Sequence, residues 1–156
     1  MTQKYNVAVA GATGAVGTEI VQILEQRNFP IDKLFLLASS KSKGKKVEFR
    51  DQEIVVEDLS EFDFSKAHIG LFSPGGKISA EFAPKAAKAG CIVIDNTSHF
   101  RMQQNIPLIV PEVNANALDD FFDDENRTNI ISNPNCSTIQ MVVALKPLHD
   151  KAIINR

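Results

Sequence analysis

The chain has 156 residues, 44% of them apolar and 23% charged, enough for one globular domain with a hydrophobic core. Seventeen Lys and Arg against nineteen Asp and Glu give a formal net charge of −2, which argues against a nucleic-acid-binding protein. No apolar run reaches the roughly 18 residues of a membrane span, no signal-peptide pattern opens the chain, and two cysteines suit a reducing compartment. We therefore expect a cytoplasmic protein without a membrane partner.

Strand and helix patterns alternate along the first half of the chain. Residues 5–10 (YNVAVA) form a short apolar run that predicts a strand, and apolar residues at helical spacing then predict a helix over 15–26. Residues 34–38 predict a second strand, and alternation on either side of Asp51 predicts a hairpin over 46–57.

The second half continues this alternation. Strands are predicted at 69–72, 91–94, 108–110 and 129–132, and helices at 79–89, 115–122 and 136–149. Gly90 is the expected residue that ends the helix at 79–89. Residues 152–155 resemble the start of another strand. Because strands alternate with helices, we predict an α/β fold with a mostly parallel sheet and helices on both faces.

A glycine-rich loop, residues 11–17 (GATGAVG), separates the first predicted strand from the first helix. Glycines there permit a tight turn and let backbone N–H groups approach a pyrophosphate, and the helix N-terminus adds its positive dipole end. The spacing is one residue longer than the simplest fingerprint, but its place after the first strand makes it specific. We therefore predict a Rossmann-like dinucleotide-binding domain; a turn without a ligand is the alternative.

The end of the second strand predicts which dinucleotide binds. A cofactor with a free ribose 2′-OH usually meets an Asp or Glu at this position. Residues 38–45 (ASSKSKGK) carry hydroxyls and lysines and no acid, which suits a 2′-phosphate. We therefore predict NADP(H), with a solvated basic loop as the alternative.

A second glycine-containing turn, residues 72–76 (FSPGG), follows the strand at 69–72. Adjacent glycines before a helix form another place where the backbone can approach a cofactor. An ordinary turn is the alternative.

Cys136 follows Asn133-Pro134-Asn135 at the predicted start of the last helix. A helix N-terminus stabilises a thiolate through its dipole and its free N–H groups, so we predict that Cys136 is a nucleophile. The same N–H groups and the Asn135 amide could stabilise an oxyanion. The alternative is a buried, inert thiol, which we expect for Cys91 in its apolar strand.

A cysteine nucleophile needs an acid–base partner. His149 lies 13 residues further on, roughly 20 Å along a straight helix, which is too far. His68 begins a strand away from the loops, and His99 lies in a loop from which it could approach. Arg101, in the same loop, could bind phosphate or carboxylate with two parallel hydrogen bonds, or it is a surface arginine.

These runs together resemble the aspartate-semialdehyde dehydrogenases. The matching runs, in the family's order, are residues 11–17, 39–45, 72–76, 95–102 (DNTSHFRM), 110–114 (VPEVN) and 132–140 (SNPNCSTIQ). The resemblance implies NADP- and phosphate-dependent interconversion of L-aspartate 4-semialdehyde and L-4-aspartyl phosphate through a cysteine thioester, on the route to lysine, threonine and methionine. It also implies a homodimer or higher homo-oligomer that binds a small-molecule substrate and inorganic phosphate.

The resemblance also implies roles for single residues and no metal site. Cys136 would be the thioester nucleophile, and Arg101, Asn96 and Asn135 would contact phosphate or substrate. The implied cofactor-binding positions are Gly11, Thr13, Gly14, Ala15, Val16, Ser40, Ser42, Ser73, Gly75 and Gly76. Lys41 stands where the family commonly has an arginine, which leaves the choice between NADP and NAD open.

The resemblance further implies two domains. Residues 1–132 would form the NADP-binding domain, and residues 133–156 would begin a catalytic and dimerisation domain whose catalytic histidine and carboxylate-binding arginine follow Arg156. We then expect this chain alone to bind cofactor without dehydrogenase activity.

Three other kinds of protein share parts of this pattern. N-acetyl-γ-glutamyl-phosphate reductase shares the fold and thioester chemistry, but its cysteine usually follows Asn-Pro-Gly rather than Asn-Pro-Asn. A non-enzymatic NADP-binding module would keep Cys136 buried and unreactive. A short-chain dehydrogenase needs a tyrosine with a lysine four residues on; Tyr5 is the sole tyrosine and Val9 stands four residues later, which argues against that group.

Overall fold

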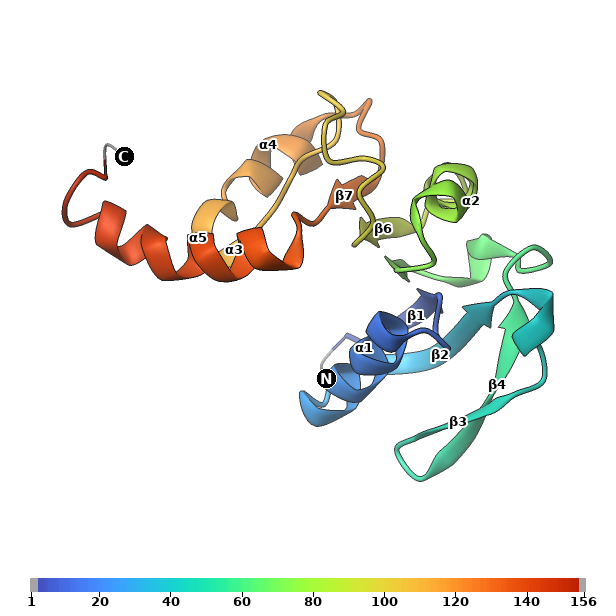
Figure 1. The fold of residues 1–156 in the computed structure, drawn as a ribbon. Helices are drawn as coiled ribbons and strands as arrows, with labels where there is room; N and C mark the ends of the chain where they lie inside the picture. The colour runs from blue at the N-terminus through green and yellow to red at the C-terminus, as the bar shows by residue number, and fades with distance from the viewer. Residues whose placement is uncertain (1–2, 155–156) are drawn as a thin grey trace.

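The computed structural model describes residues 3–154 and shows one seven-stranded sheet of order β3-β4-β2-β1-β5-β6-β7 (Figure 1). The strands are β1 Tyr5–Ala10, β2 Ile31–Ala38, β3 Lys46–Phe49, β4 Gln52–Asp58, β5 Ile69–Phe72, β6 Ile92–Asp95 and β7 Ile130–Ser132. The helices are α1 Ala15–Gln26, α2 Gly76–Lys88, α3 Pro111–Asn114, α4 Ala117–Asp123 and α5 Cys136–His149, with 3-10 turns η1 Ser40–Ser42 and η2 Phe64–Lys66. All neighbouring strands are parallel except the β3–β4 hairpin.

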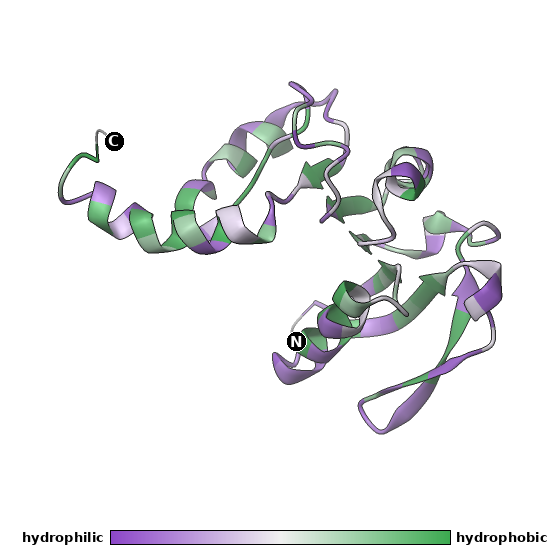
Figure 2. Cartoon of the chain, viewed as in Figure 1, coloured by the Kyte–Doolittle hydropathy of each residue, from purple (hydrophilic) through white to green (hydrophobic). Residues whose placement is uncertain are grey.

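Helices cover both faces of this sheet. Successive side chains of a strand point to opposite faces, so β1 contributes to two cores. Val7 and Val9 pack with Val21 of α1, whereas Ala8 and Ala10 join the cluster that contains the buried alanines of α2. Figure 2 shows how strongly hydrophobic the central strands are. The predicted α/β, Rossmann-like fold with helices on both faces is therefore confirmed.

The hairpin and the last helix form as predicted. Arg50 and Asp51, between β3 and β4, have φ of 50° and 60°, the left-handed pair that a two-residue type I′ turn requires. The last helix spans the predicted residues 136–149. No helix in the described part of the chain is long and apolar enough to cross a membrane.

Several boundaries differ from the prediction. The second strand begins at Ile31 rather than at residue 34, because the residues before Leu34, including the polar Lys33, also pair with β1. Leu108 forms only an isolated bridge to Ser132, so no strand covers 108–110. Residues 152–154 form no strand, and Asn155 lies outside the described residues.

The second long helix begins at Gly76, three residues before the predicted start. Gly75 has φ 94° and ψ 152°, a conformation that glycine adopts readily and other residues rarely adopt. This lets the chain turn into α2 shortly after β5. At the other end, Gly90 has φ 92°, as expected of the residue that ends the helix.

The last helix lies apart from the sheet. Helix α5 contacts the short helix α3, and none of its residues is buried. Figure 1 shows α5 extending away from the strands. Its apolar surface is therefore largely open.

Candidate active site

The loops that carry the predicted site follow neighbouring parallel strands. From β1 the chain continues to β2 on one side, and later returns to β5 on the other side. In open α/β sheets, a ligand binds outside the carboxyl ends of the strands at such a switch point. The glycine loop follows β1, and the loops after β5, β6 and β7 carry the other predicted residues. The topology therefore brings these loops to one edge.

The glycine loop is shaped by close backbone contacts. Gly11 has φ 84°, and a Cβ on it would lie 2.9 Å from backbone atoms of Ser73 and Pro74. A Cβ on Gly17 would lie 2.1 Å from the Gly11 carbonyl oxygen. Side chains at these two positions would therefore collide with the backbone.

The N-terminus of α1 is open to an anion. Its N-cap, Gly14, provides no side-chain cap, and no acidic residue stands in the first turn. The first N–H groups of a helix lack intrahelical acceptors, and the helix dipole favours negative charge there. This loop therefore fits a pyrophosphate.

A cleft of about 440 Å³ opens beside the glycine loop. It is bounded by the glycine loop, the ends of β2 and β4, the β5–α2 loop and α2. Of the predicted cofactor positions, Gly11, Thr13, Gly14, Ser40 and Ser73 line it, whereas Ala15, Val16, Ser42, Gly75 and Gly76 do not. The structure thus brings half of these positions to one cleft.

The Ser/Lys loop after β2 is joined to the glycine loop and to the segment that follows β4. The Thr13 hydroxyl donates to the Ser42 hydroxyl at 3.4 Å, which ties this loop to the glycine loop. Lys43 pairs with Glu61, and this hydrogen bond and charge raise the pKa of Lys43. Lys41 forms no ion pair among the described residues, so its charge is available to a phosphate.

Sequence reasoning missed the far wall of the cleft. Asp58, Leu59 and Ser60 line it at the end of β4, and Ile78 and Phe82 line it from α2. The predicted hairpin ends at residue 57, just before these three residues. Only the pairing of β4 with β2 shows that this end lies at the same edge as the glycine loop.

Arg101 joins the loops after β6 and β7. Its Nε donates to the Asn133 carbonyl and its Nη2 to the Asn96 carbonyl, both at 2.9 Å. The Asn133 side chain donates to the Asn96 side chain at 2.7 Å. No hydrogen bond among residues 3–154 uses Nη1 of Arg101. Arg101 and Asn96 are therefore brought together beside the turn that leads to the cysteine.

Cys136 is the first residue of α5 and is exposed. Asn135 is the N-cap, and its side-chain oxygen accepts from the Ser137 N–H at 2.9 Å. The Cys136 Sγ lies 3.9 Å from the same oxygen. Cys91, by contrast, is fully buried, and burial raises the pKa of its thiol to about 12. The two thiols thus differ in accessibility: Cys136 is exposed, and Cys91 is buried, as expected from its apolar strand.

None of the three histidines forms a hydrogen bond with Cys136. His68 Nδ1 accepts from the Asn6 N–H at 2.9 Å, which is a structural role. His99 packs edge-on against Phe100 with ring centroids 4.7 Å apart. His149 ends α5, the helix that Cys136 begins. Among the described residues, no cluster of His, Cys, Asp and Glu could hold a metal ion.

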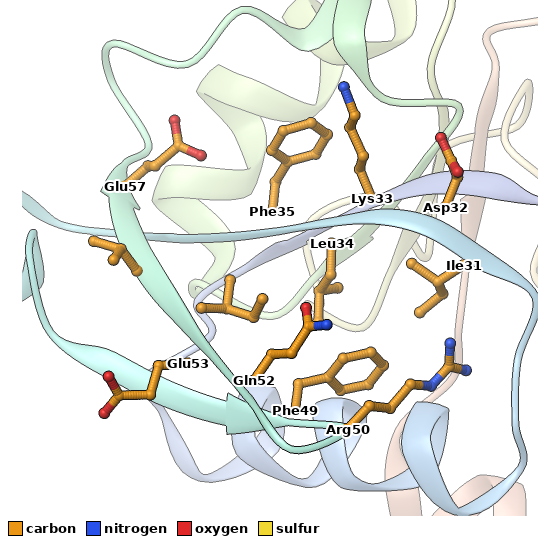
Figure 3. Close-up of a pocket in the computed structure, with 12 residues that line it drawn as sticks. Ile31, Asp32, Lys33, Leu34, Phe35, Phe49, Arg50, Gln52, Glu53 and Glu57 are labelled. Atoms are coloured by element: carbon orange, nitrogen blue, oxygen red, sulfur yellow. The ribbon is translucent and has the colours of Figure 1, made fainter.

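A larger cavity, of about 630 Å³, lies between β2 and β4 where the two strands diverge. Figure 3 shows Leu34 and Phe49 on one side of β2 and Phe35 on the other, with charged side chains around them. It borders the amino-terminal half of β2, and no predicted site residue lines it. The carboxyl ends of the strands, where dinucleotides bind, are elsewhere.

Comparisons with known proteins show which family this chain resembles. The family described as "Semialdehyde dehydrogenase, NAD binding domain" matches residues 6–121. Aspartate-semialdehyde dehydrogenase 2 of Vibrio cholerae is 56% identical over all 156 residues, which cover 45% of that protein. The chain therefore spans about half the length of the curated relatives it matches.

Two solved structures have the same fold. The Vibrio cholerae aspartate semialdehyde dehydrogenase II complexed with ASA has a TM-score of 0.89 at 56% identity, covering 95% of this chain and 47% of that one. The Candida albicans enzyme with NADP has a TM-score of 0.77 at 26% identity, covering 97% and 48%. The family match covers most of the chain, and the geometry of the glycine loop agrees with it. This chain therefore belongs to the semialdehyde dehydrogenase NAD binding domain family.

Proposed function

We propose that this chain binds NADP(H) and carries the cysteine nucleophile of an aspartate-semialdehyde dehydrogenase. The observation that carries the proposal is the position of Cys136. It is exposed at the N-terminus of α5, directly after a strand of the same parallel sheet whose first strand leads into the glycine loop. The relatives named aspartate-semialdehyde dehydrogenase support the substrate assignment.

The residues of the cleft have the chemistry to hold this cofactor. Gly11, Thr13 and Gly14 would surround the pyrophosphate at the N-terminus of α1. Ser40 and Lys41 would bind the 2′-phosphate, with hydroxyl donors and a free positive charge. Ser73, Gly75 and Gly76 would lie toward the nicotinamide half. When bound, the nicotinamide accepts or supplies a hydride.

Cys136 would act on the aldehyde carbon of L-aspartate 4-semialdehyde. Its thiolate would add to this carbon. The N–H groups of the first turn of α5 would stabilise the resulting oxyanion, apart from the Ser137 N–H, which donates to Asn135. The oxyanion would collapse to a carbonyl as the carbon–hydrogen bond breaks and its hydride leaves for the oxidised cofactor, so that a thioester remains on Sγ. A phosphate oxygen then attacks the thioester carbon, the thiolate leaves, and L-4-aspartyl phosphate forms.

Arg101 would bind the attacking phosphate through the nitrogen that the fold leaves free. Its Nε and Nη2 are used by backbone carbonyls, which hold the guanidinium in place, and Nη1 remains available. Asn96 and Asn135 flank this region and would contact phosphate or substrate. A charge-assisted bond from Arg is well suited to phosphate.

The remaining expectations concern the whole protein. Residues 1–132 would form the cofactor domain and 133–156 would begin the catalytic domain, a division supported by the exposed α5. The whole enzyme would be a cytoplasmic homodimer or higher homo-oligomer serving the synthesis of lysine, threonine and methionine.

Calorimetric titration of the purified chain with NADPH and NADH tests the cofactor assignment. We expect NADPH to bind at least tenfold tighter, because Ser40 and Lys41 meet a phosphate that NADH lacks. Ser40→Asp should remove this preference, since a carboxylate repels the 2′-phosphate and accepts from a free 2′-OH. Equal affinity for the two dinucleotides, or no binding to a folded sample, would contradict the assignment.

A further inference from the structure

The end of β4 forms a wall of the cleft one strand beyond the Ser/Lys loop. β4 runs parallel to β2 with Asp58 in register with Ala38, and the Leu59 N–H donates to the Ala38 carbonyl at 2.8 Å. If the glycine loop holds the pyrophosphate and the end of β2 the ribose, the base attached to that ribose reaches the end of β4. This step rests on the proposed binding of NADP(H).

Asp58 is held in a fixed orientation at this wall. It is only 8% exposed, and its Oδ1 accepts from both the N–H and the hydroxyl of Ser60, at 2.9 and 2.7 Å. No hydrogen bond among the described residues reaches Oδ2. The two Ser60 donors hold the pKa of Asp58 below its usual range. An ionised carboxylate can only accept, so Oδ2 of this cleft-lining residue is an acceptor with no hydrogen-bond donor among the described residues.

Apolar side chains line the same cleft, together with its serines. Leu59 follows it in the chain and is 5% exposed, and Ile78 and Phe82 project from α2. A flat heteroaromatic ring can pack on such side chains, and a single polar group then determines its orientation. Most of the base would meet hydrocarbon, and only one edge would meet the carboxylate.

We propose that Asp58 recognises the adenine of the dinucleotide by accepting a hydrogen bond from its exocyclic amine. Adenine presents a donor at this position, whereas hypoxanthine presents a carbonyl oxygen, which the carboxylate repels. A hydrogen bond to a charged acceptor is stronger than a neutral one, so loss of the amine should weaken binding by roughly 10- to 100-fold. Asp58 is thus a specificity-determining residue for the base.

Asp63 provides a matched control, because the same local turn occurs there. Its Oδ1 accepts from the N–H and the hydroxyl of Ser65, at 3.0 and 2.7 Å. Asp63 does not line the cleft. A role of Asp58 that is confined to shaping its turn would therefore be shared by Asp63, whereas recognition of the base would not.

The experiment compares NADPH with its deamino analogue, reduced nicotinamide hypoxanthine dinucleotide phosphate, by calorimetry on the chain. We expect the wild type to bind NADPH at least tenfold tighter. Asp58→Asn, whose amide can donate to the hypoxanthine oxygen, should bring the affinity ratio to one or below. Asp63→Asn should keep the wild-type ratio.

The outcomes distinguish a failure of this inference from a failure of the proposed function. Equal binding of the two dinucleotides by the wild type overturns the role of Asp58 and leaves NADP(H) binding intact. A wild-type preference that persists in Asp58→Asn also overturns it. If the wild type binds neither dinucleotide, the proposed cofactor function itself fails, and the inference falls with it.

Discussion

The environments of the two cysteines differ in the properties that control thiol reactivity. Cys136 is exposed at a helix N-terminus with its sulfur near the side chain of the N-cap Asn135. Cys91 is fully enclosed by the core beneath α2. Thiolates react, and burial in an apolar core suppresses their formation. The environment of each residue, rather than its type, therefore distinguishes an accessible thiol from a core thiol.

Iodoacetamide at pH 8 should modify Cys136 and leave Cys91 unmodified. The Cys91 pKa of about 12 keeps its thiol protonated at this pH, and the core excludes the reagent. Mass spectrometry of tryptic peptides at successive times measures both rates. In urea, where the chain unfolds, the two rates should converge. Modification of Cys91 as fast as Cys136 in the native protein would contradict the burial described.

The β1–α1 turn depends on glycine because its backbone segments touch. Gly11 lies against the backbone of Ser73 and Pro74, so this turn also packs on the loop that follows β5. Gly17, in the first turn of α1, lies directly over Gly11. The β1–α1 turn therefore needs glycine at positions 11 and 17 for packing, in addition to any role of its glycines in approaching a phosphate.

Gly17→Ala should destabilise the protein by about 1–3 kcal/mol. Its Cβ would lie 2.1 Å from a backbone oxygen, so the start of α1 must shift. Gly14→Ala is the control: its Cβ would meet the same oxygen at 3.4 Å and φ is −86°, so a smaller loss is expected. Urea unfolding followed by circular dichroism gives both free energies. Equal losses would show that the contact does not govern the turn.

The molecule as a whole consists of a compact sheet and one helix that leaves it. Helix α1 buries Gly17, Val21 and Leu24, whereas α5 buries no residue along its 14 positions. Figure 2 shows hydrophobic residues along α5, and Met141 and Leu148 are 55% and 61% exposed. Most helical stability in proteins comes from packing of an apolar face, so α5 receives little of it here.

Hydrogen exchange should therefore be faster in α5 than in α1. The two helices have 14 and 12 residues, so length favours α5, and tertiary packing is what separates them. Exchange of the purified chain followed by mass spectrometry resolves the two segments. Protection of α5 equal to that of α1 would mean that another surface covers α5 in solution.

The sequence by itself determined most of the order of strands and helices along the chain, the glycine turn and the helix that begins at Cys136, but it missed α3 and predicted a strand at 108–110 that does not form. These features depend on local rules: apolar periodicity, glycine conformation and the helix start after Asn133-Pro134-Asn135. Strand ends such as Ile31 were less predictable, because pairing with β1 extends β2 through polar residues.

Only the tertiary structure decided which side chains share a site. Asp58 and Ser40 are 18 positions apart, and only the parallel pairing of β4 with β2 puts both on one cleft. The hydrogen bonds of Arg101 to two separate loops likewise depend on β6 and β7 being neighbours. Local sequence patterns do not determine which strands become neighbours in the sheet, because contacts between distant residues form only when the whole core assembles.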